Sequence, residues 1–238
     1  MTLLTAIDTR ISRRSYKPEP LRAEDAQALQ AAIVQTNQKM PLIVGDGSAF
    51  AGFKKSYGMF KGVANYIALV RDANDPHSAE KLGYYGEEVV LAATARGLGT
   101  CWVAGSYDKA SVAVPLAPNE SIICTITVGD VAEELTGKEK LLRKATRSKS
   151  KAAEALFTAD SAVPDWFLQG IAAVQKAPSA RNRQPVLFSY KNGAVTAVVS
   201  DYDSASMAID LGIAKRHFAL AAGGAWGWGN GAAFTQSR

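Results

Sequence analysis

The residues best suited to chemistry near the start of the chain are Arg13-Arg14-Ser15-Tyr16-Lys17, just ahead of the first expected helix. Two guanidinium groups, a hydroxyl and an ammonium within five residues can clamp a phosphate and an electron-rich ring. Basic N-termini are more often simply solvated, so this segment alone decides nothing.

A second polar group is the segment 177–185, APSARNRQP, between an expected helix and an expected strand. Ser179, Asn182 and Gln184, held between prolines, offer neutral donors and acceptors suited to the edge of a heterocycle. The alternative is an ordinary polar loop with turn chemistry.

The third group is the segment 83–105, GYYGEEVVLAATARGLGTCWVAG. Its small residues allow close helix packing, and Gly97-Leu98-Gly99 ends the helix. The chain then reaches Ala104-Gly105, where a backbone N–H can approach a ligand closely. A core helix is the alternative for most of this segment.

The elements that must position these groups follow from periodicity and turn residues. We expect an Asn192-Gly193 hairpin, and Trp226 and Trp228 on one face of a closing strand. The mixture favours an α+β sandwich. Helices are expected over 22–36, 84–96, 164–176 and 206–222, and strands over 63–70, 122–128, 186–190 and 195–199.

An internal repeat indicates two similar halves. Leu82-Gly83 followed by 91–93 (LAA) recurs as Leu211-Gly212 followed by 220–222, at an offset of 129 positions. Pro41 and its two apolar successors correspond to Pro185 at an offset of 144. The difference between these two offsets matches the length of an extra segment, Ser48 to Gly62, in the first half. This segment is rich in aromatic and basic residues, and a lid over a cofactor and a surface excursion that plugs the core remain equally open.

Together the three motifs resemble the nitroreductase family of FMN-dependent oxidoreductases. That family typically shows RRS near the N-terminus, PSxxNxQP before a strand, and a G…LAA…GLG(S/T)CW…G helix and turn. Here the PSARNRQP segment comes last. With the repeat, this order makes the chain similar to the monomeric, fused pseudo-dimer branch of the family. The resemblance implies an α/β sandwich of two similar halves, residues 1–160 and 161–238.

The resemblance further implies one complete FMN site per chain. The counterpart of PSARNRQP in the first half carries Gln35, Gln38 and Met40, and no RRS precedes the helix at Asp165, so the reciprocal site should be dead. The cofactor-binding residues implied are Arg13, Arg14, Ser15, Lys17, Ala104, Gly105, Arg147, Lys149, Pro178, Ser179 and Asn182.

Individual roles follow from the same resemblance. Arg13 and Ser15 would hold the phosphate with Arg147 or Lys149, and Lys17 would lie near flavin N1 and raise the potential. Ser179 and Asn182 would contact the ring or the ribityl chain, and the Gly105 N–H would meet N5. The family often has Glu before this glycine, whereas this chain has Ala104.

The implied function is an FMN-dependent NAD(P)H oxidoreductase that reduces nitroaromatics, quinones or similar small acceptors by ping-pong hydride transfer. NAD(P)H would bind transiently, and no catalytic acid or base is required because the cofactor carries the hydride. The alternatives are an FMN-binding carrier, sensor or regulator without turnover, and a flavin-free relic.

Composition and charge bear on the other functional classes, which include nucleic-acid-binding, metal-binding and membrane proteins. The chain has 238 residues and a net charge of +5, with seven basic residues between Lys138 and Lys151 against one acid, Glu139. We interpret this run as a solvated face with one or two residues for a phosphate, since no nucleic-acid motif accompanies it. Cys101 and Cys124 fit core positions, and we expect no metal site, no membrane span, a cytoplasmic location and a monomer.

Overall fold

The structure is a computed structural model that describes residues 1–52, 56–147 and 150–237. The chain forms two compact units, Met1–Pro76 with Glu88–Lys144 and His77–Glu87 with Ala145–Arg238. The longer segment of the second unit begins at Ala145. Its first strand, Phe157–Ala159 (β5), pairs with a strand of the second sheet. The boundary at residue 160 that the sequence led us to expect stays a prediction.

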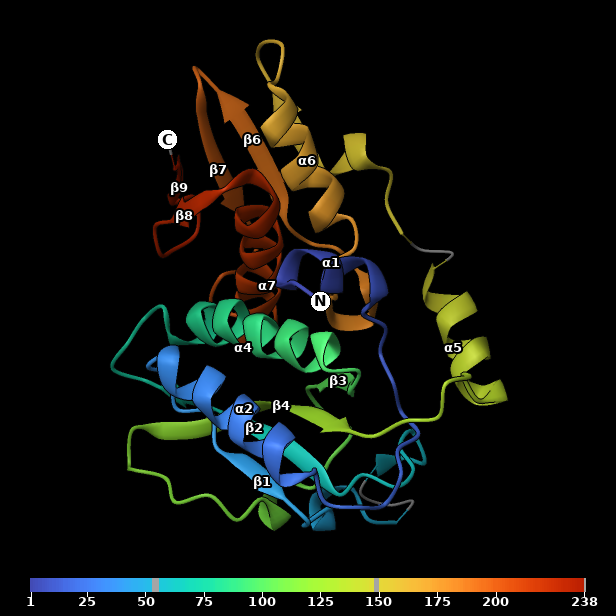
Figure 1. Cartoon of the computed structure of the whole chain (residues 1–238). Helices are drawn as coiled ribbons and strands as arrows, with labels where there is room; N and C mark the ends of the chain where they lie inside the picture. The colour runs from blue at the N-terminus through green and yellow to red at the C-terminus, as the bar shows by residue number, and fades with distance from the viewer. Residues whose placement is uncertain (53–55, 148–149, 238) are drawn as a thin grey trace. The chain divides into compact units, whose positions relative to one another are not determined.

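The first unit contains a four-stranded antiparallel sheet in the order β1-β2-β4-β3. In Figure 1 helix α2 runs alongside β1 and β2. The elements of this unit are α1 (Leu3–Thr9), α2 (Ala23–Gln35), β1 (Leu42–Val44), η1 (Ser48–Phe50), β2 (Asn65–Asp72), β3 (Gly99–Val103), η2 (Lys109–Ser111), β4 (Glu120–Gly129) and α5 (Gly137–Arg147).

The second unit contains a five-stranded sheet in the order β5-β6-β7-β9-β8, in which β5 alone runs parallel to its neighbour. Helices α6 and α7 lie side by side against this sheet (Figure 1). Its elements are η3 (Ala153–Leu156), β5, α6 (Asp165–Val174), η4 (Ala180–Asn182), β6 (Leu187–Lys191), β7 (Ala194–Val198), α7 (Ala205–Ala222), β8 (Gly224–Trp226) and β9 (Ala233–Gln236).

The two halves share one topology, as the repeat predicted. The order α2-β1-β2-α4-β3-β4 is repeated as α6-β6-β7-α7-β8-β9, where α4 is Ser78–Ala95. The sheet orders β1-β2-β4-β3 and β6-β7-β9-β8 correspond strand for strand, and every one of these pairings is antiparallel. The α+β fold with two similar halves is therefore confirmed.

The repeat also appears in the packing of α4 against α7. A Cβ on Gly83 would lie 2.2 Å from the carbonyl oxygen of Ile209, and one on Gly212 would lie 2.0 Å from that of Glu80. Glu80 and Ile209 are separated by the same 129 positions as the two glycines. The crossing is thus reciprocal, as in an interface with two-fold symmetry.

Local signals explain most element ends. Helix α4 ends at Ala95, because Gly97 (φ 81°) adopts the left-handed conformation and the N–H of Leu98 bonds to the Ala93 carbonyl. Asn192 (φ 50°) and Gly193 (φ 76°) form the predicted hairpin turn.

Two element predictions were wrong in extent. Helix α4 begins at Ser78 rather than near Tyr84, and its first turns bury the polar side chains of Ser78 and Glu80 together with Leu82, which obscures the apolar pattern. The closing strand β8 ends at Trp226, so Trp228 does not share a strand face with it. Trp228 instead packs edge-on against Tyr84, with ring centroids 5.4 Å apart.

Cys101 and Cys124 are both buried, as expected of core residues. No group of three His, Cys, Asp or Glu side chains in the described part of the chain is placed to hold a metal ion. None of the helices that the structure describes has the length and apolar character needed to cross a membrane.

Candidate functional site

The RRS segment and the helix–turn motif come together in the first unit. The backbone N–H of Arg13 donates to the carbonyl of Thr100, 2.8 Å away, at the start of β3. A Cβ on Gly99 would lie 3.0 Å from the Arg13 Cβ and 2.3 Å from a methyl carbon of Val131. The second glycine of the turn therefore leaves room for the arginine backbone and its neighbours to lie against the strand.

Glu139 anchors this segment to helix α5. Its Oε1 accepts hydrogen bonds from Arg14 N (2.7 Å), Ser15 N (3.2 Å) and Arg13 Nε (3.2 Å). Its Oε2 accepts from Thr136 N and Oγ1, both at 2.9 Å, and Thr136 Oγ1 accepts from Glu139 N, which makes a capping box. Burial raises the pKa of Glu139, but these hydrogen bonds outweigh it and hold the pKa at about 2.

Arg13 is buried inside this arrangement, with 5% of its surface exposed. Besides Glu139, its guanidinium donates through Nη2 to the carbonyls of Ala132 (2.9 Å) and Glu134 (3.2 Å). Arg13 therefore holds the segment against α5, which differs from the direct phosphate contact that the sequence suggested. The competing partner is Glu139, which the sequence showed only as the one acid in a basic run.

A pocket of about 340 Å³ lies beside the segment. Arg14, Ser15, Lys61 and Lys138 bring three cations and a hydroxyl to its wall, and the Lys138 ammonium donates to the carbonyl of Gly58. Within the described part of the chain, the side chains of Arg14, Ser15 and Lys61 form no hydrogen bond or ion pair. The lining residues are Arg14, Ser15, Gly58, Met59, Phe60, Lys61, Thr136, Lys138, Glu139 and Leu142.

The extra segment is partly anchored to this pocket. The Lys61 N–H donates to the Arg14 carbonyl at 2.9 Å, and the Tyr16 N–H donates to the Lys61 carbonyl at 2.9 Å. Phe50 is buried in the core, 5.4 Å between centroids from Tyr66, which supports the core-plug interpretation for that residue. Phe53, Lys54 and Lys55 lie outside the described residues, so the lid interpretation remains a hypothesis.

Lys17, Ala104 and Gly105 are exposed in the first unit. No atom lies within 4 Å of a Cβ placed on Gly105, and its N–H has no acceptor in the described part of the chain. The ammonium of Lys17 is likewise without an ion pair there. All three residues are therefore open to a ligand without any rearrangement of the fold.

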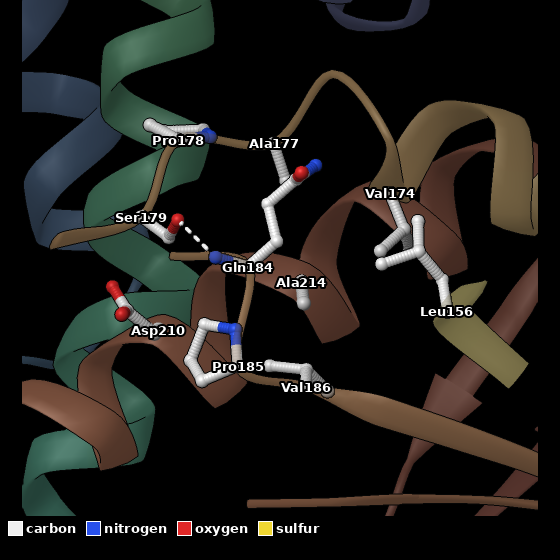
Figure 2. Close-up of a pocket in the computed structure, with 10 residues that line it drawn as sticks. All are labelled: Leu156, Val174, Ala177, Pro178, Ser179, Gln184, Pro185, Val186, Asp210 and Ala214. Atoms are coloured by element: carbon white, nitrogen blue, oxygen red, sulfur yellow. Dashed lines mark hydrogen bonds between the residues drawn. The ribbon is translucent and has the colours of Figure 1, made fainter. Parts of the chain in front are cut away.

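The PSARNRQP loop lies in the second unit (Figure 2). Ser179 Oγ accepts from Gln184 N at 2.9 Å, and Asn182 Nδ2 donates to Ser150 Oγ at 3.1 Å. Arg181 (φ 55°), Asn182 (φ 53°) and Gln184 (φ 46°) all have left-handed backbones. Such conformations cost about 1 kcal/mol or more each in non-glycine residues and concentrate at functional sites.

Gln184 closes the base of this loop. Its Oε1 accepts from Lys151 N (2.7 Å), its Nε2 donates to the Gln175 carbonyl (3.1 Å), and its own carbonyl accepts from Lys151 Nζ (2.9 Å). The small pocket beneath, about 10 Å³, has room for roughly one water molecule. Gln184 thus holds the base of the loop together.

Comparison with known proteins places the chain in a family. The profile of a family described as "Putative TM nitroreductase" matches residues 2–222, nearly the whole chain. The chain belongs to this nitroreductase family. The resemblance of its three motifs is therefore confirmed at the level of the family.

Solved structures that are similar to this chain include several described as nitroreductases. A structure from Thermotoga maritima, described as a putative nitroreductase, has a TM-score of 0.65 at 20% identity and covers 98% of this chain and 92% of its own. An FMN-dependent nitroreductase from Clostridium difficile covers 54% of this chain and 87% of its own, at 21% identity and a TM-score of 0.45. A nitroreductase with bound FMN from Bacteroides fragilis covers 57% and 91%, at 16% identity and a TM-score of 0.43. A search of curated proteins found no match.

Two of the basic residues predicted to bind the cofactor, Arg147 and Lys149, have no described side chain. Lys149 lies outside the described residues, and α5 ends at Arg147, whose side chain is not described. The same basic run instead contributes Lys138 to the pocket and Lys151 to the base of the PSARNRQP loop. Sequence reasoning recognised the run as a phosphate candidate without identifying these two members.

Asp210 is a further residue near the PSARNRQP loop that the sequence analysis did not single out. It lies on α7 beside Ser179 (Figure 2), and its carboxylate accepts from Ala180 N at 3.1 and 3.2 Å. Burial raises the pKa of Asp210 to about 7, although the Ala180 N–H and the charge of Arg183 lower it. The only sign of Asp210 in the sequence was its position as an acidic residue among the apolar residues of an expected core helix.

Asp210→Asn is expected to remove a pH dependence of stability. The pKa of Asp210 rises from 3.8 to about 7 on folding, so the native state holds a proton that the unfolded chain loses. Stability should therefore fall by on the order of 3 kcal/mol as pH rises from about 4 to about 7. Urea unfolding at pH 4.5 and 8 tests this, because the asparagine variant should show a much flatter profile. Equal slopes in both proteins would contradict the assignment.

Proposed function

We propose that this protein is an FMN-dependent NAD(P)H oxidoreductase that reduces nitroaromatics, quinones or similar small acceptors in a ping-pong cycle. Family membership supports a flavin oxidoreductase in general terms. The observation that carries the finer proposal is the basic pocket lined by Arg14, Ser15 and Lys61, three residues whose side chains have no hydrogen-bond partner in the described part of the chain. Three cations around one pocket suit a phosphate monoester.

The residues present fit FMN in their chemistry. Arg14 and Ser15 would hold the phosphate, while Lys17 would place a positive charge near the ring. Gly105 would offer its backbone N–H at a position where a Cβ meets no protein atom. We propose that Pro178, Ser179 and Asn182 of the second unit complete the binding set, with one FMN per chain in a monomeric, cytoplasmic protein.

When bound, FMN supplies the hydride chemistry, and the protein supplies orientation and charge. Arg14 and Ser15 fix the phosphate end, so the ring is presented in one orientation. Neither a general acid nor a general base is assigned, because the exchange of a hydride between donor and acceptor does not require one. NAD(P)H and the acceptor would bind one after the other at the solvent-exposed face of the flavin ring.

Purified protein tests the proposal directly. We expect a yellow protein that releases FMN, identified by its mass, at one equivalent per chain, and that oxidises NADH or NADPH when a nitro compound or quinone is supplied. Protein that neither contains nor takes up flavin would refute it. Bound FMN without turnover would favour the carrier or sensor alternative. One sequence feature fits that alternative, because this chain has Ala104 where the family often has glutamate.

Lys17→Ala is expected to lower the flavin potential without disturbing the fold. Lys17 is exposed and its ammonium has no ion pair in the described chain, so its loss costs little stability. A cation favours the more negatively charged, reduced form, and losing about 1.4 kcal/mol of that preference shifts a two-electron couple by about 30 mV. Redox titration against a reference dye measures the shift. Lys109→Gln, at an exposed position on η2, is the control, and an unchanged potential in Lys17→Ala would remove this assignment.

A further inference from the structure

We propose that Lys61 of the extra segment and Lys138 of α5 complete a phosphate subsite with Arg14 and Ser15, and that Glu139 is its positioning residue. The inference rests on the proposed function and deepens it, because it names the residues that recognise the phosphate of the flavin. It also gives a specific use to the lone acid of the basic run.

The first step concerns two backbone N–H groups that Glu139 makes unavailable to a ligand. The backbone N–H groups of Arg14 and Ser15 point at Glu139 Oε1, at 2.7 and 3.2 Å. Such paired N–H groups commonly bind anions, but here an internal carboxylate occupies them. A phosphate ligand is therefore left with the side chains of these residues.

The second step is the charge that remains. Glu139 and the Arg13 guanidinium are 2% and 6% exposed and pair with each other at 3.2 Å, so they largely cancel. Arg14, Lys61 and Lys138 line the pocket in excess of this pair. The pocket therefore keeps three positive charges, which suit a dianionic phosphate and leave a neutral ligand unrecognised.

The third step is how the side chains are held. The carbonyl of Arg14 accepts from Lys61 N at 2.9 Å, so the extra segment runs beside Arg14. Gly62 (φ 70°) permits this approach, since a Cβ there would lie 2.2 Å from the Tyr16 carbonyl oxygen. Lys138 lies one residue before Glu139 in the capping box, so the same carboxylate fixes both walls of the pocket.

The test compares FMN with riboflavin, which has the same ring and no phosphate. Apoprotein is titrated with each flavin, and binding is followed by the quenching of flavin fluorescence. Lys61→Gln is expected to weaken FMN binding about tenfold or more, as the loss of a charged contact does. Glu139→Gln is expected to weaken FMN binding by about as much, because the loosened hydrogen bonds to Arg14 N and Ser15 N displace the side chains of the subsite, and this displacement outweighs the positive charge left on Arg13. Riboflavin binding should change less than about twofold. Lys109→Gln and Glu133→Gln, at exposed positions, are the controls with matched charge changes.

The outcomes separate the inference from the proposed function. Wild-type protein that binds neither flavin would refute the function itself. Wild-type protein that binds FMN, with variants that lose neither flavin or lose both equally, would overturn the subsite. Should Glu139→Gln fail to fold, Thr136→Ala, which removes one hydroxyl bond to the same carboxylate, is expected to weaken FMN several-fold and riboflavin hardly at all; an unchanged ratio would overturn the role of Glu139.

Discussion

Replacing Gly212 with alanine is expected to destabilise the fold by about 4 kcal/mol or more, a large part of the 5–15 kcal/mol that holds a domain together. The added Cβ would lie 2.0 Å from the carbonyl oxygen of Glu80 and 2.6 Å from the N of Tyr84. Both are backbone atoms of α4, so the clash cannot be relieved by a rotamer change. The two helices would have to separate.

Thermal or urea unfolding followed by far-UV circular dichroism measures this loss, and Gly83→Ala should behave alike because its Cβ would meet the Ile209 carbonyl at 2.2 Å. The matched control is Gly137→Ala, at the start of α5, where a Cβ meets no atom within 4 Å. This control should be neutral or slightly stabilising. Gly212→Ala with the midpoint of the wild type would show that the helices do not cross as described.

Breaking the buried ion pair of Lys215 and Glu80 is expected to have the second large effect. Both side chains are fully buried, and Lys215 Nζ donates to Glu80 Oε1 at 2.5 Å and to the carbonyls of Gly227 and Gly229 at 3.1 and 3.0 Å. Glu80 Oε2 in turn accepts from Tyr202 OH at 2.6 Å and Gly229 N at 2.8 Å. The pair thus fastens the glycine-rich C-terminal turn to helices α4 and α7.

Lys215→Met should cost about 3–5 kcal/mol because it leaves the Glu80 carboxylate buried and uncompensated. The double variant Glu80→Leu with Lys215→Met should recover a substantial part of that loss, since no lone charge remains. Lys140→Met is the control, because Lys140 and Glu134 form an exposed pair at 3.4 Å and exposed pairs contribute little. A single variant as stable as this control would show that the pair is not buried in solution.

The sequence predicted the fold well where one physical signal dominated. Apolar periodicity gave α2, α6 and α7, and Asn192-Gly193 gave the hairpin of β6 and β7. The repeat gave two halves of equal topology. The start of α4 was missed because Glu80 is buried by pairing with a lysine 135 positions away, a contact that no local pattern encodes.

The motifs of the candidate site could be predicted from the sequence, whereas the hydrogen-bond and ion-pair partners of their residues could not. The sequence singled out Arg14 and Ser15, which line the pocket, but gave Arg13 a ligand contact that Glu139 pre-empts. Glu139, Lys61 and Asp210 could not be found, because each owes its place to a contact with a distant segment. Whether the two predicted halves of the flavin site meet remains a prediction.

The Glu80–Lys215 pair carries a consequence for ancestry. At the offset of the repeat, Glu80 corresponds to Ile209 and Lys215 to Gly86, so each half encodes one member of the pair only. Two identical copies of the first half would bury a carboxylate with no cation to meet it. Because two unlike copies are joined in one polypeptide, Glu80 in the first half and Lys215 in the second could each arise without a counterpart in its own half. If the halves were separated, we would expect each to associate with the other rather than with a second copy of itself.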